Sequence, residues 1–403
     1  MGGPVVQSSD MVTDAELSAL RAHISTAEPD FLADLERLVN IDSGSYTKAG
    51  VDEVGRWVGG ALRGLGADVA IEANAELGDT VVGRLAGAAG PRVLLIGHLD
   101  TVFAPGTAAQ RPFGTRDGRA RGPGVTDMKA GLLCGLYALR ALAALGPLPR
   151  LVFIANPDEE IGSPASGAII RREAAEADYA LVLECARANG DIVSARKGVV
   201  DYELHLRGRA AHAGVEPEKG RSAVVEAAHK TVALTALNGR WPGVTVNVGV
   251  IRGGTRPNVV ADECELQVDL RAPAREPMEA AEAELRAICA ASTVADVTCQ
   301  LRERNRHWPM EKSPPTAALV ERAVALAGRL GFELNDAATG GASDANTTAA
   351  MGVPTLDGLG PVGGLDHSPG EYLELDSIVP RTTLLAALLL SLGRGGLAGA
   401  PAG

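Results

Sequence analysis

The chain has 403 residues, which is more than one hydrophobic core usually accommodates, so we expect two domains. Its content of 46% hydrophobic and 22% charged residues is typical of a soluble globular protein. The formal net charge of -12 argues against nucleic acid or an anionic membrane as a partner, because both bind basic surfaces.

Helices are predicted to open the chain. Thr13 and Glu16 have the spacing of a capping box, and helical patterns follow at 30–39 and 51–65. Short apolar strands then alternate with helices. The strands are expected at 81–85, 92–96, 151–155 and 180–183, and the helices at 129–145 and 164–177. This order predicts an α/β domain whose mostly parallel central sheet is covered on both faces.

The pattern changes near residue 196. Strands that alternate apolar and polar residues are expected at 199–207, 244–251 and 263–270, with helices at 221–237 and 277–292. They predict an α+β sandwich with an antiparallel sheet. The α/β pattern returns from residue 313, with helices at 316–330 and 379–392. We therefore expect one domain from residues 1–195 and 313–403, and a second domain, residues 196–312, inserted into it.

The cysteines and the N-terminal residues indicate the cellular compartment of the protein. The five cysteines are scattered, odd in number and free of Cys-x-x-Cys spacing, which favours free thiols in a reducing compartment. The first ten residues have neither the basic nor the apolar segment of a signal peptide. We expect a cytoplasmic protein that is not bound to a membrane.

Five possible metal ligands lie at the ends of apolar segments or in turns beside them: His98, Asp127, Glu160, Glu184 and His367. Two imidazoles and three carboxylates are the ligand set that a pair of hydrolytic zinc ions needs. Three of the five follow predicted strands, and the carboxyl ends of parallel strands form the ligand crevice of an open α/β sheet. The set therefore indicates an enzyme.

Each of these residues alone has a simpler interpretation. His98 could be a structural histidine at a strand end, Asp127 an N-cap, Glu160 a solvated loop residue and His367 a surface residue. Two neighbours favour the functional interpretation. Asp100 lies two residues after His98, on the same side of an extended chain, where it could orient the imidazole. Glu159 could serve as a general base beside a metal ligand.

The motifs resemble those of a di-zinc metallopeptidase and amidohydrolase family. This family contains glutamate carboxypeptidase, acetylornithine deacetylase, succinyl-diaminopimelate desuccinylase and aminoacylase, and the chain looks most like bacterial glutamate carboxypeptidase. The segments that carry the resemblance lie between about Leu35 and Leu392. They are 97–101, 122–129, 157–162, 183–185 and 365–368, with 208–214, 256–258, 268–271 and 339–344 in or near the inserted domain.

The resemblance implies a role for each site residue. His98 and Glu184 would bind one Zn2+, Glu160 and His367 the other, and Asp127 would bridge the two. Asp100 would orient His98, and Glu159 would be the general base. The peptide bond between Asp127 and Met128 would be cis. Co2+ or Mn2+ would be possible substitutes for Zn2+.

For the inserted domain the resemblance implies a lid that also forms a homodimer. His212 would polarise the scissile carbonyl, and Asn258, Arg271, Arg306 and Gly341 would bind the substrate. The implied reaction is cleavage of an amide bond next to a free carboxylate, most simply by an exopeptidase that releases a C-terminal amino acid. An N-acyl-amino-acid deacylase is the alternative, and a non-catalytic binding or scaffolding relative is a third hypothesis.

Overall fold

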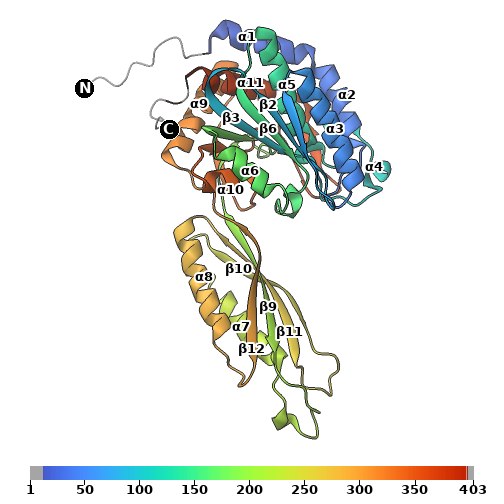
Figure 1. Cartoon of the computed structure of the whole chain (residues 1–403), viewed down its shortest axis with the longest axis vertical. Helices are drawn as coiled ribbons and strands as arrows, with labels where there is room; N and C mark the ends of the chain where they lie inside the picture. The colour runs from blue at the N-terminus through green and yellow to red at the C-terminus, as the bar shows by residue number, and fades with distance from the viewer. Residues whose placement is uncertain (1–11, 396, 398–403) are drawn as a thin grey trace, which may run out of the picture. The chain divides into compact units, whose positions relative to one another are not determined.

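The computed structural model describes residues 12–395 and Leu397, which divide into two compact units (Figure 1). Unit 1 contains the described residues up to Ser194, then Lys312–Ala338 and those from Ser343 onward. Unit 2 contains Ala195–Glu311 and Thr339–Ala342. The first ten residues, from which the absence of a signal peptide is predicted, lie outside the described part of the chain.

A six-stranded sheet forms the centre of unit 1, in the order β1-β2-β6-β3-β7-β14. The strands are β1 (Asp68–Glu72), β2 (Thr80–Leu85), β3 (Ala88–His98), β6 (Pro149–Asn156), β7 (Tyr179–Val182) and β14 (Thr355–Leu356). The neighbours β6, β3, β7 and β14 run parallel, whereas β1 and β2 are antiparallel additions at one edge. This confirms the predicted α/β class with a mostly parallel sheet.

Helices cover both faces of this sheet (Figure 1). The larger layer is α1 (Asp14–Thr26), α2 (Glu28–Val39), α3 (Lys48–Gly64), α5 (Ala130–Leu145), α9 (Pro314–Leu330) and α11 (Ile378–Gly395). Their apolar sides bury one continuous core against strand residues such as Leu95 and Phe153. The shorter helices α6 (Gly167–Ala174) and α10 (Asp344–Ala350) lie on the opposite side (Figure 1). The predicted capping box is present, since Thr13 and Glu16 bond each other's backbone.

A small four-stranded sheet, β15-β16-β5-β4, leads into the segments that contain Asp127 and His367. Its strands are β4 (Gly114–Arg116), β5 (Arg119–Arg121), β15 (Gly363–Gly364) and β16 (Tyr372–Glu374). β8 (Ile192–Arg196) and β13 (Asp336–Thr339) form a two-stranded ladder. Single turns occur at α4 (Thr107–Gln110), η1 (Val125–Lys129), η2 (Glu159–Ile161) and η4 (Leu375–Ser377).

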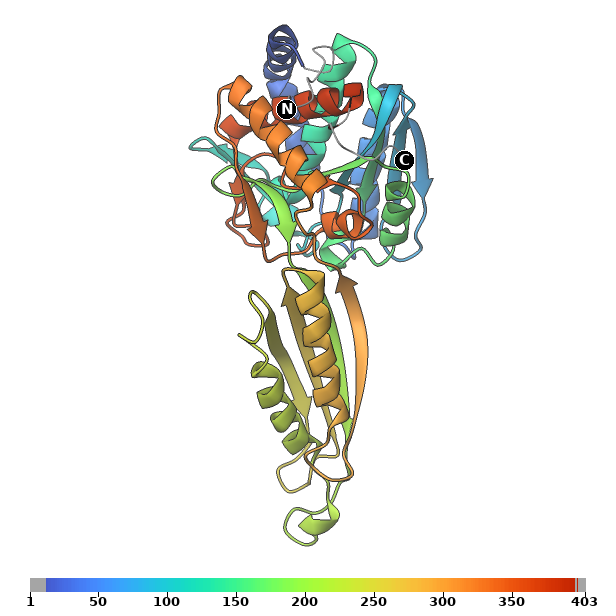
Figure 2. The same cartoon turned by 90° about the vertical axis from the view of Figure 1, so that its left-hand side faces the viewer.

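Unit 2 is an antiparallel sheet with two helices on one face (Figure 2). The strand order is β10-β11-β9-β12, from β9 (Gly198–Arg207), β10 (Thr245–Gly253), β11 (Glu263–Ala272) and β12 (Thr298–His307). The helices are α7 (Ala223–Thr235) and α8 (Arg275–Ala290), and η3 (Pro217–Lys219) is a short turn. Side chains from both layers form a second hydrophobic core, which includes Leu204, Leu266 and Leu285.

Two helical segments are long and apolar enough to cross a membrane by length and composition alone. They are Val125–Leu145 and Leu375–Gly395. In their most apolar windows, 78% and 72% of the residues are buried inside the structure, as expected of core helices.

Candidate active site

Three parallel strands bring candidate ligands to one edge of the central sheet. β3 ends at His98, which pairs with Asn156 at the end of β6, and Ile96 pairs with Val182 at the end of β7. Glu160 follows β6 by four residues and Glu184 follows β7 by two. Because neighbouring parallel strands end at the same edge, residues far apart in the chain meet there.

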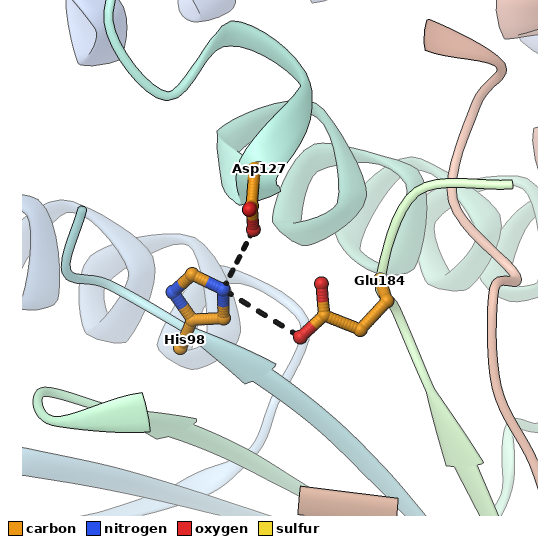
Figure 3. A group of neighbouring side chains, drawn as sticks. All are labelled: His98, Asp127 and Glu184. Atoms are coloured by element: carbon orange, nitrogen blue, oxygen red, sulfur yellow. Dashed lines mark hydrogen bonds and ion pairs between the residues drawn. The ribbon is translucent and has the colours of Figure 1, made fainter. Parts of the chain in front are cut away.

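The first cluster consists of His98, Asp127 and Glu184 (Figure 3). The imidazole Nε2 of His98 lies 3.1 Å from Asp127 Oδ1 and 3.6 Å from Glu184 Oε1. Both His98 and Glu184 are buried. One nitrogen and two carboxylate oxygens therefore point at a common position, as the ligands of one ion do.

The second cluster consists of Asp127, Glu160 and His367. The imidazole Nε2 of His367 lies 3.0 Å from Asp127 Oδ2 and 3.1 Å from Glu160 Oε2. The His367 side chain is 56% exposed, as expected of a loop residue, whereas that of Glu160 is only 5% exposed. The interpretation of Glu160 as a solvated loop residue is therefore wrong.

Asp127 belongs to both clusters and uses a different oxygen in each. It lies in the irregular turn η1, and its peptide bond to Met128 is cis, as the resemblance implies. The N-cap position of α5 is occupied by Lys129, without a side-chain cap, so the N-cap interpretation of Asp127 is wrong.

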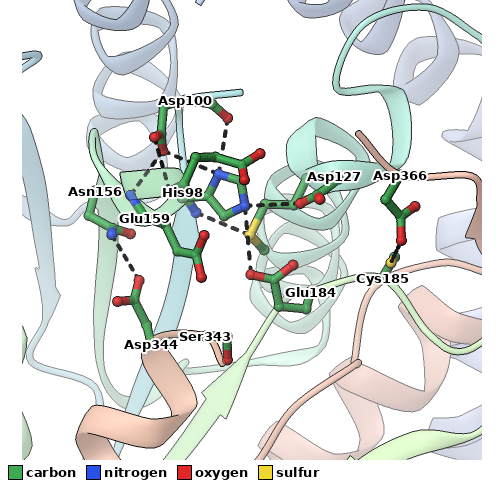
Figure 4. A network of polar contacts seen from close by, with 12 residues as sticks. His98, Asp100, Asp127, Asn156, Glu159, Glu184, Cys185, Ser343, Asp344 and Asp366 are labelled. Atoms are coloured by element: carbon green, nitrogen blue, oxygen red, sulfur yellow. Dashed lines mark hydrogen bonds and ion pairs between the residues drawn. The ribbon is translucent and has the colours of Figure 1, made fainter. Parts of the chain in front are cut away.

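Asp100 lies beside the imidazole of His98 (Figure 4). Nδ1 of His98 lies 3.0 Å from the backbone oxygen of Asp100 and 3.3 Å from its carboxylate Oδ1. The carboxylate also accepts hydrogen bonds from Ser45 Oγ (2.7 Å) and from the backbone N–H groups of Glu159 and Glu160 (both 3.2 Å). A proton on Nδ1 would leave the Nε2 lone pair free for a metal, which is how carboxylates orient histidine ligands.

Glu159 lies beside the first cluster, in the same close-up as His98, Glu184 and Asp344 (Figure 4). Burial raises the pKa of its carboxyl well above the usual range, and the charges of Glu184 and Asp344 act in the same direction. A carboxyl group that takes up a proton this readily suits general base and acid work.

The site carries strong negative charge. Hydrogen bonds with Asp127 and Glu160 raise the pKa of His367 to about 11. Burial lowers the pKa of His98, but hydrogen bonds with Asp100 and Asp127, together with the charge of Glu184, raise it well above its usual value. Carboxylates that hold protons on two imidazoles this tightly form a site that attracts cations.

The residues present fit a pair of divalent ions. Glu160 Oε1 is buried, and no hydrogen-bond partner for it occurs among the described residues. Such an oxygen is costly to bury unless something binds it. Imidazole nitrogen and carboxylate oxygen are ligands that Zn2+ accepts, and a carboxylate that uses both oxygens can bridge two ions.

The other predicted site residues lie in unit 2. His212 and Asn258 are neighbours there, because His212 forms a β-bridge with Val259 and Ala213 N donates to the Asn258 carbonyl oxygen (3.0 Å). Both side chains are exposed. Arg271 pairs with Asp269 and also donates to the Gly340 carbonyl oxygen (2.9 Å), next to Gly341.

Arg306 has a different environment from the one that the resemblance implies. Its guanidinium lies 2.5 Å from Glu282 Oε1 and 2.8 Å from Glu303 Oε2. Two carboxylates of unit 2 thus already neutralise it.

Sequence reasoning missed several residues that support the site. Ser45 bonds Asp100, Asp344 accepts from Asn156 Nδ2 (2.8 Å) and Ser163 Oγ (2.6 Å), and Glu371 bonds the turn before α5. Ser45 and Glu371 lie in loops, and no local motif marks them. Asp344 lies in the segment 339–344 that carries the resemblance, but no role was predicted for it.

A mostly parallel sheet whose strand ends carry two clusters of His, Asp and Glu that share one aspartate defines a metal-dependent hydrolase. Residues 94–391 match the model of peptidase family M20/M25/M40. The chain belongs to this family of metallopeptidases, as the motifs predict.

Relatives of known name support this assignment. The chain is 30% identical to carboxypeptidase G2 of Pseudomonas sp. (strain RS-16) over 378 residues, which cover 91% of this chain and 90% of that protein. It is 33% identical to acetylornithine deacetylase of Myxococcus xanthus over 198 residues, 46% of this chain and 50% of the relative. The fold is similar to that of aminopeptidase PepT from Bacillus cereus, with a TM-score of 0.77, 24% identity, and coverage of 91% of this chain and 98% of the other.

Proposed function

We propose that this chain is a two-zinc exopeptidase that releases a C-terminal amino acid from a peptide or acylated substrate. The observation that carries the proposal is the placement of Asp127, whose two carboxylate oxygens face the imidazoles of His98 and His367 at 3.1 and 3.0 Å. The similarity to carboxypeptidase G2 over nine-tenths of both chains favours the carboxypeptidase reaction.

The residues then have distinct roles. When bound, two Zn2+ ions would polarise the scissile carbonyl and activate the attacking water. Glu159 accepts the proton of that water and returns it to the leaving nitrogen, for which its raised pKa is suited. Asp100 keeps the His98 ring in position. We propose that His212 donates a hydrogen bond to the carbonyl oxygen, as the motif around it implies.

The substrate carboxylate requires cationic and amide donors, which we assign to Arg271, Asn258 and the loop at Gly341. Arg271 is part-buried, and its contacts with Asp269 and Gly340 hold its guanidinium in a fixed orientation. We assign Arg306 no role in this set, because two carboxylates, Glu282 and Glu303, pair with its guanidinium, whereas one carboxylate, Asp269, pairs with Arg271.

The role of Glu159 can be tested against its neighbour. Glu159→Gln should reduce turnover by roughly 10²–10⁴-fold and leave two metal ions per chain, because the amide cannot accept the proton. Glu160→Gln should instead lower the metal content, since this residue belongs to the second cluster. Metal analysis and single-substrate kinetics distinguish the two. A near-wild-type rate for Glu159→Gln would exclude it as the base.

A deacylase that uses the same site is the second candidate, favoured by the similarity to acetylornithine deacetylase over about half of each chain. A panel that compares peptides ending in glutamate with N-acyl amino acids separates the two reactions. We expect kcat/KM to be higher for the peptides. The reverse order would make the protein a deacylase, and no turnover of any substrate with full metal occupancy would favour a non-catalytic relative.

We also propose a homodimer formed through unit 2. β10 is an edge strand, and the helix α7 beside it exposes Val224, Val225 and Val232. Ile251 on β10 is 52% exposed. An unpaired strand edge beside apolar side chains is suited to pairing with a second copy of itself.

The dimer predicts a specific loss on substitution. Val232→Glu combined with Ile251→Glu should convert the protein to a monomer in light scattering after size exclusion. Val324→Glu is the matched control, because Val324 is a similarly exposed apolar residue of α9 in unit 1 and should leave the mass unchanged. A wild-type protein that is monomeric at micromolar concentration would refute the proposal.

A cytoplasmic location fits the cysteines, all five of which are free thiols in the structure. Fractionation of the source cells should place the protein with cytoplasmic markers, and recovery from the medium or the envelope would contradict this location.

A further inference from the structure

Resting on the proposed two-metal function, we infer that Glu371 is a positioning residue, which fixes the turn that carries Asp127 and links it to the loop that carries His367. None of the motifs that define the site includes Glu371. Its side chain is 2% exposed, so a carboxylate has been removed from water at this position without a metal-ligand role of its own.

The contacts of Glu371 all go to the backbone of one turn. Oε1 accepts hydrogen bonds from the N–H groups of Thr126 (2.9 Å) and Asp127 (3.1 Å), and Oε2 accepts one from Gly124 (3.0 Å). Three donors that converge on two oxygens define the position of the turn in three dimensions. Glu371 therefore fixes the backbone position from which the Asp127 side chain extends, although its own contacts are with backbone N–H groups.

The same residue is tied to the second cluster through the chain. β15 and β16 form a hairpin, and the segment between them carries both His367 and Glu371. β16 pairs with β5, which leads directly into the turn that contains Asp127. The packing is tight, since a Cβ at Gly363 would lie 2.2 Å from Thr126 Oγ1. A shift of the hairpin would thus move one histidine ligand and the shared aspartate together.

Only a carboxylate satisfies all three donors. Glutamine has one acceptor oxygen, and its NH2 group would face an N–H, which leaves at least one buried donor without a partner. The buried Lys129 amine donates to the carbonyl oxygens of Ile41 and Pro123; burial lowers its pKa to about 7, and the charge of nearby Glu371 raises it. This arrangement explains how the structure tolerates a buried acidic side chain here.

The test compares Glu371→Gln with Glu374→Gln. Glu374 is the matched control, because it lies three residues further along the chain, on β16, and pairs with Arg119 (2.7 Å) instead of the turn. In metal-free protein, amide hydrogen exchange of a peptide that spans 122–129 should accelerate in Glu371→Gln only. Zinc affinity, measured by competition with a chromophoric chelator, should fall about 10–100-fold in Glu371→Gln and stay unchanged in the control.

The results distinguish failure of the positioning role of Glu371 from failure of the proposed two-metal function. Unchanged exchange at 122–129 would overturn the positioning role. Faster exchange with wild-type zinc affinity would also overturn it, because Glu371 would then be only structural. A wild-type protein that binds no zinc would refute the proposed function, while the exchange measurement would still decide whether Glu371 holds the turn. With saturating zinc, Glu371→Gln should lower kcat with KM little changed.

Discussion

Asp127 joins the two clusters, because each of its carboxylate oxygens faces a different histidine. Glu184 belongs only to the first cluster and His367 only to the second. Removal of the shared residue should therefore have a different effect from removal of a residue that serves one cluster.

We predict that Asp127→Ala binds no zinc tightly, whereas Glu184→Ala and His367→Ala each retain about one ion per chain. The reason is that each single-cluster substitution leaves the other set of three side chains complete. Metal analysis after gel filtration in metal-free buffer measures this directly. Equal zinc content in all three variants would show that Asp127 is not shared.

The candidates for the site could be selected from the sequence because their residue types stand at strand ends and in Gly-rich turns. The supporting residues could not. Ser45 bonds Asp100 across 55 positions of the chain, and Glu371 bonds Thr126 across 245. Such contacts depend on how the strands and hairpins assemble, and no local pattern encodes them.

The elements differ in how far the sequence determines them. Long amphipathic helices and apolar strands were predictable because their periodicity is strong, and the predicted helix at 316–330 corresponds to α9. β12 was missed because its sequence, Thr298–His307, is mostly charged and polar. It lies at the edge of its sheet and pairs only with β9. α10 has seven residues, too few for a helical period to be read with certainty.

The pairing of α1 with α11 predicts a dependence of stability on pH. Glu16 Oε1 lies 2.5 Å from Arg394 Nη2, and this hydrogen bond lowers the pKa of Glu16 from the usual 4.5 to about 2. A lowered pKa in the folded state means that the stabilisation is present above about pH 4.5 and is lost as the pH falls toward 2.

Glu16→Gln should therefore melt below the wild type at pH 6, by the equivalent of at most about 1 kcal/mol for this partly exposed pair. The difference should shrink as the pH falls from about 4.5 to about 2. Thermal unfolding by circular dichroism measures it, and the double variant Glu16→Gln/Arg394→Gln serves as the control. A difference that stays constant with pH would show that the charge of Glu16 is not responsible.

The described residues form two separate hydrophobic cores, one in each unit, and both candidate metal clusters belong to unit 1. Units with their own cores can unfold independently, and a ligand stabilises only the unit that binds it. The sequence predicts two such cores. Continuously apolar strands, typical of a sheet covered on both faces, and strands that alternate apolar and polar residues, typical of a sheet with one buried face, occupy different parts of the chain.

Calorimetry should accordingly show two transitions, of which only one rises in temperature with added Zn2+ and falls with EDTA. Leu266→Ala, in the core of unit 2, should lower the free energy of unfolding of unit 2 by about 2–5 kcal/mol and so lower the temperature of the zinc-insensitive transition. A single transition that moves with zinc would show that the two units unfold together.

Unit 1 is completed only when the chain returns to it after unit 2. His98, Asp127, Glu160 and Glu184 are synthesised before the inserted unit, whereas His367 and Glu371 follow it. A nascent chain on the ribosome therefore holds an incomplete second cluster and an unsupported Asp127 turn until the segment that contains His367 and Glu371 has been translated. The hydrolytic site thus cannot mature before the segment that follows unit 2 has emerged, so an interrupted translation product carries no complete site.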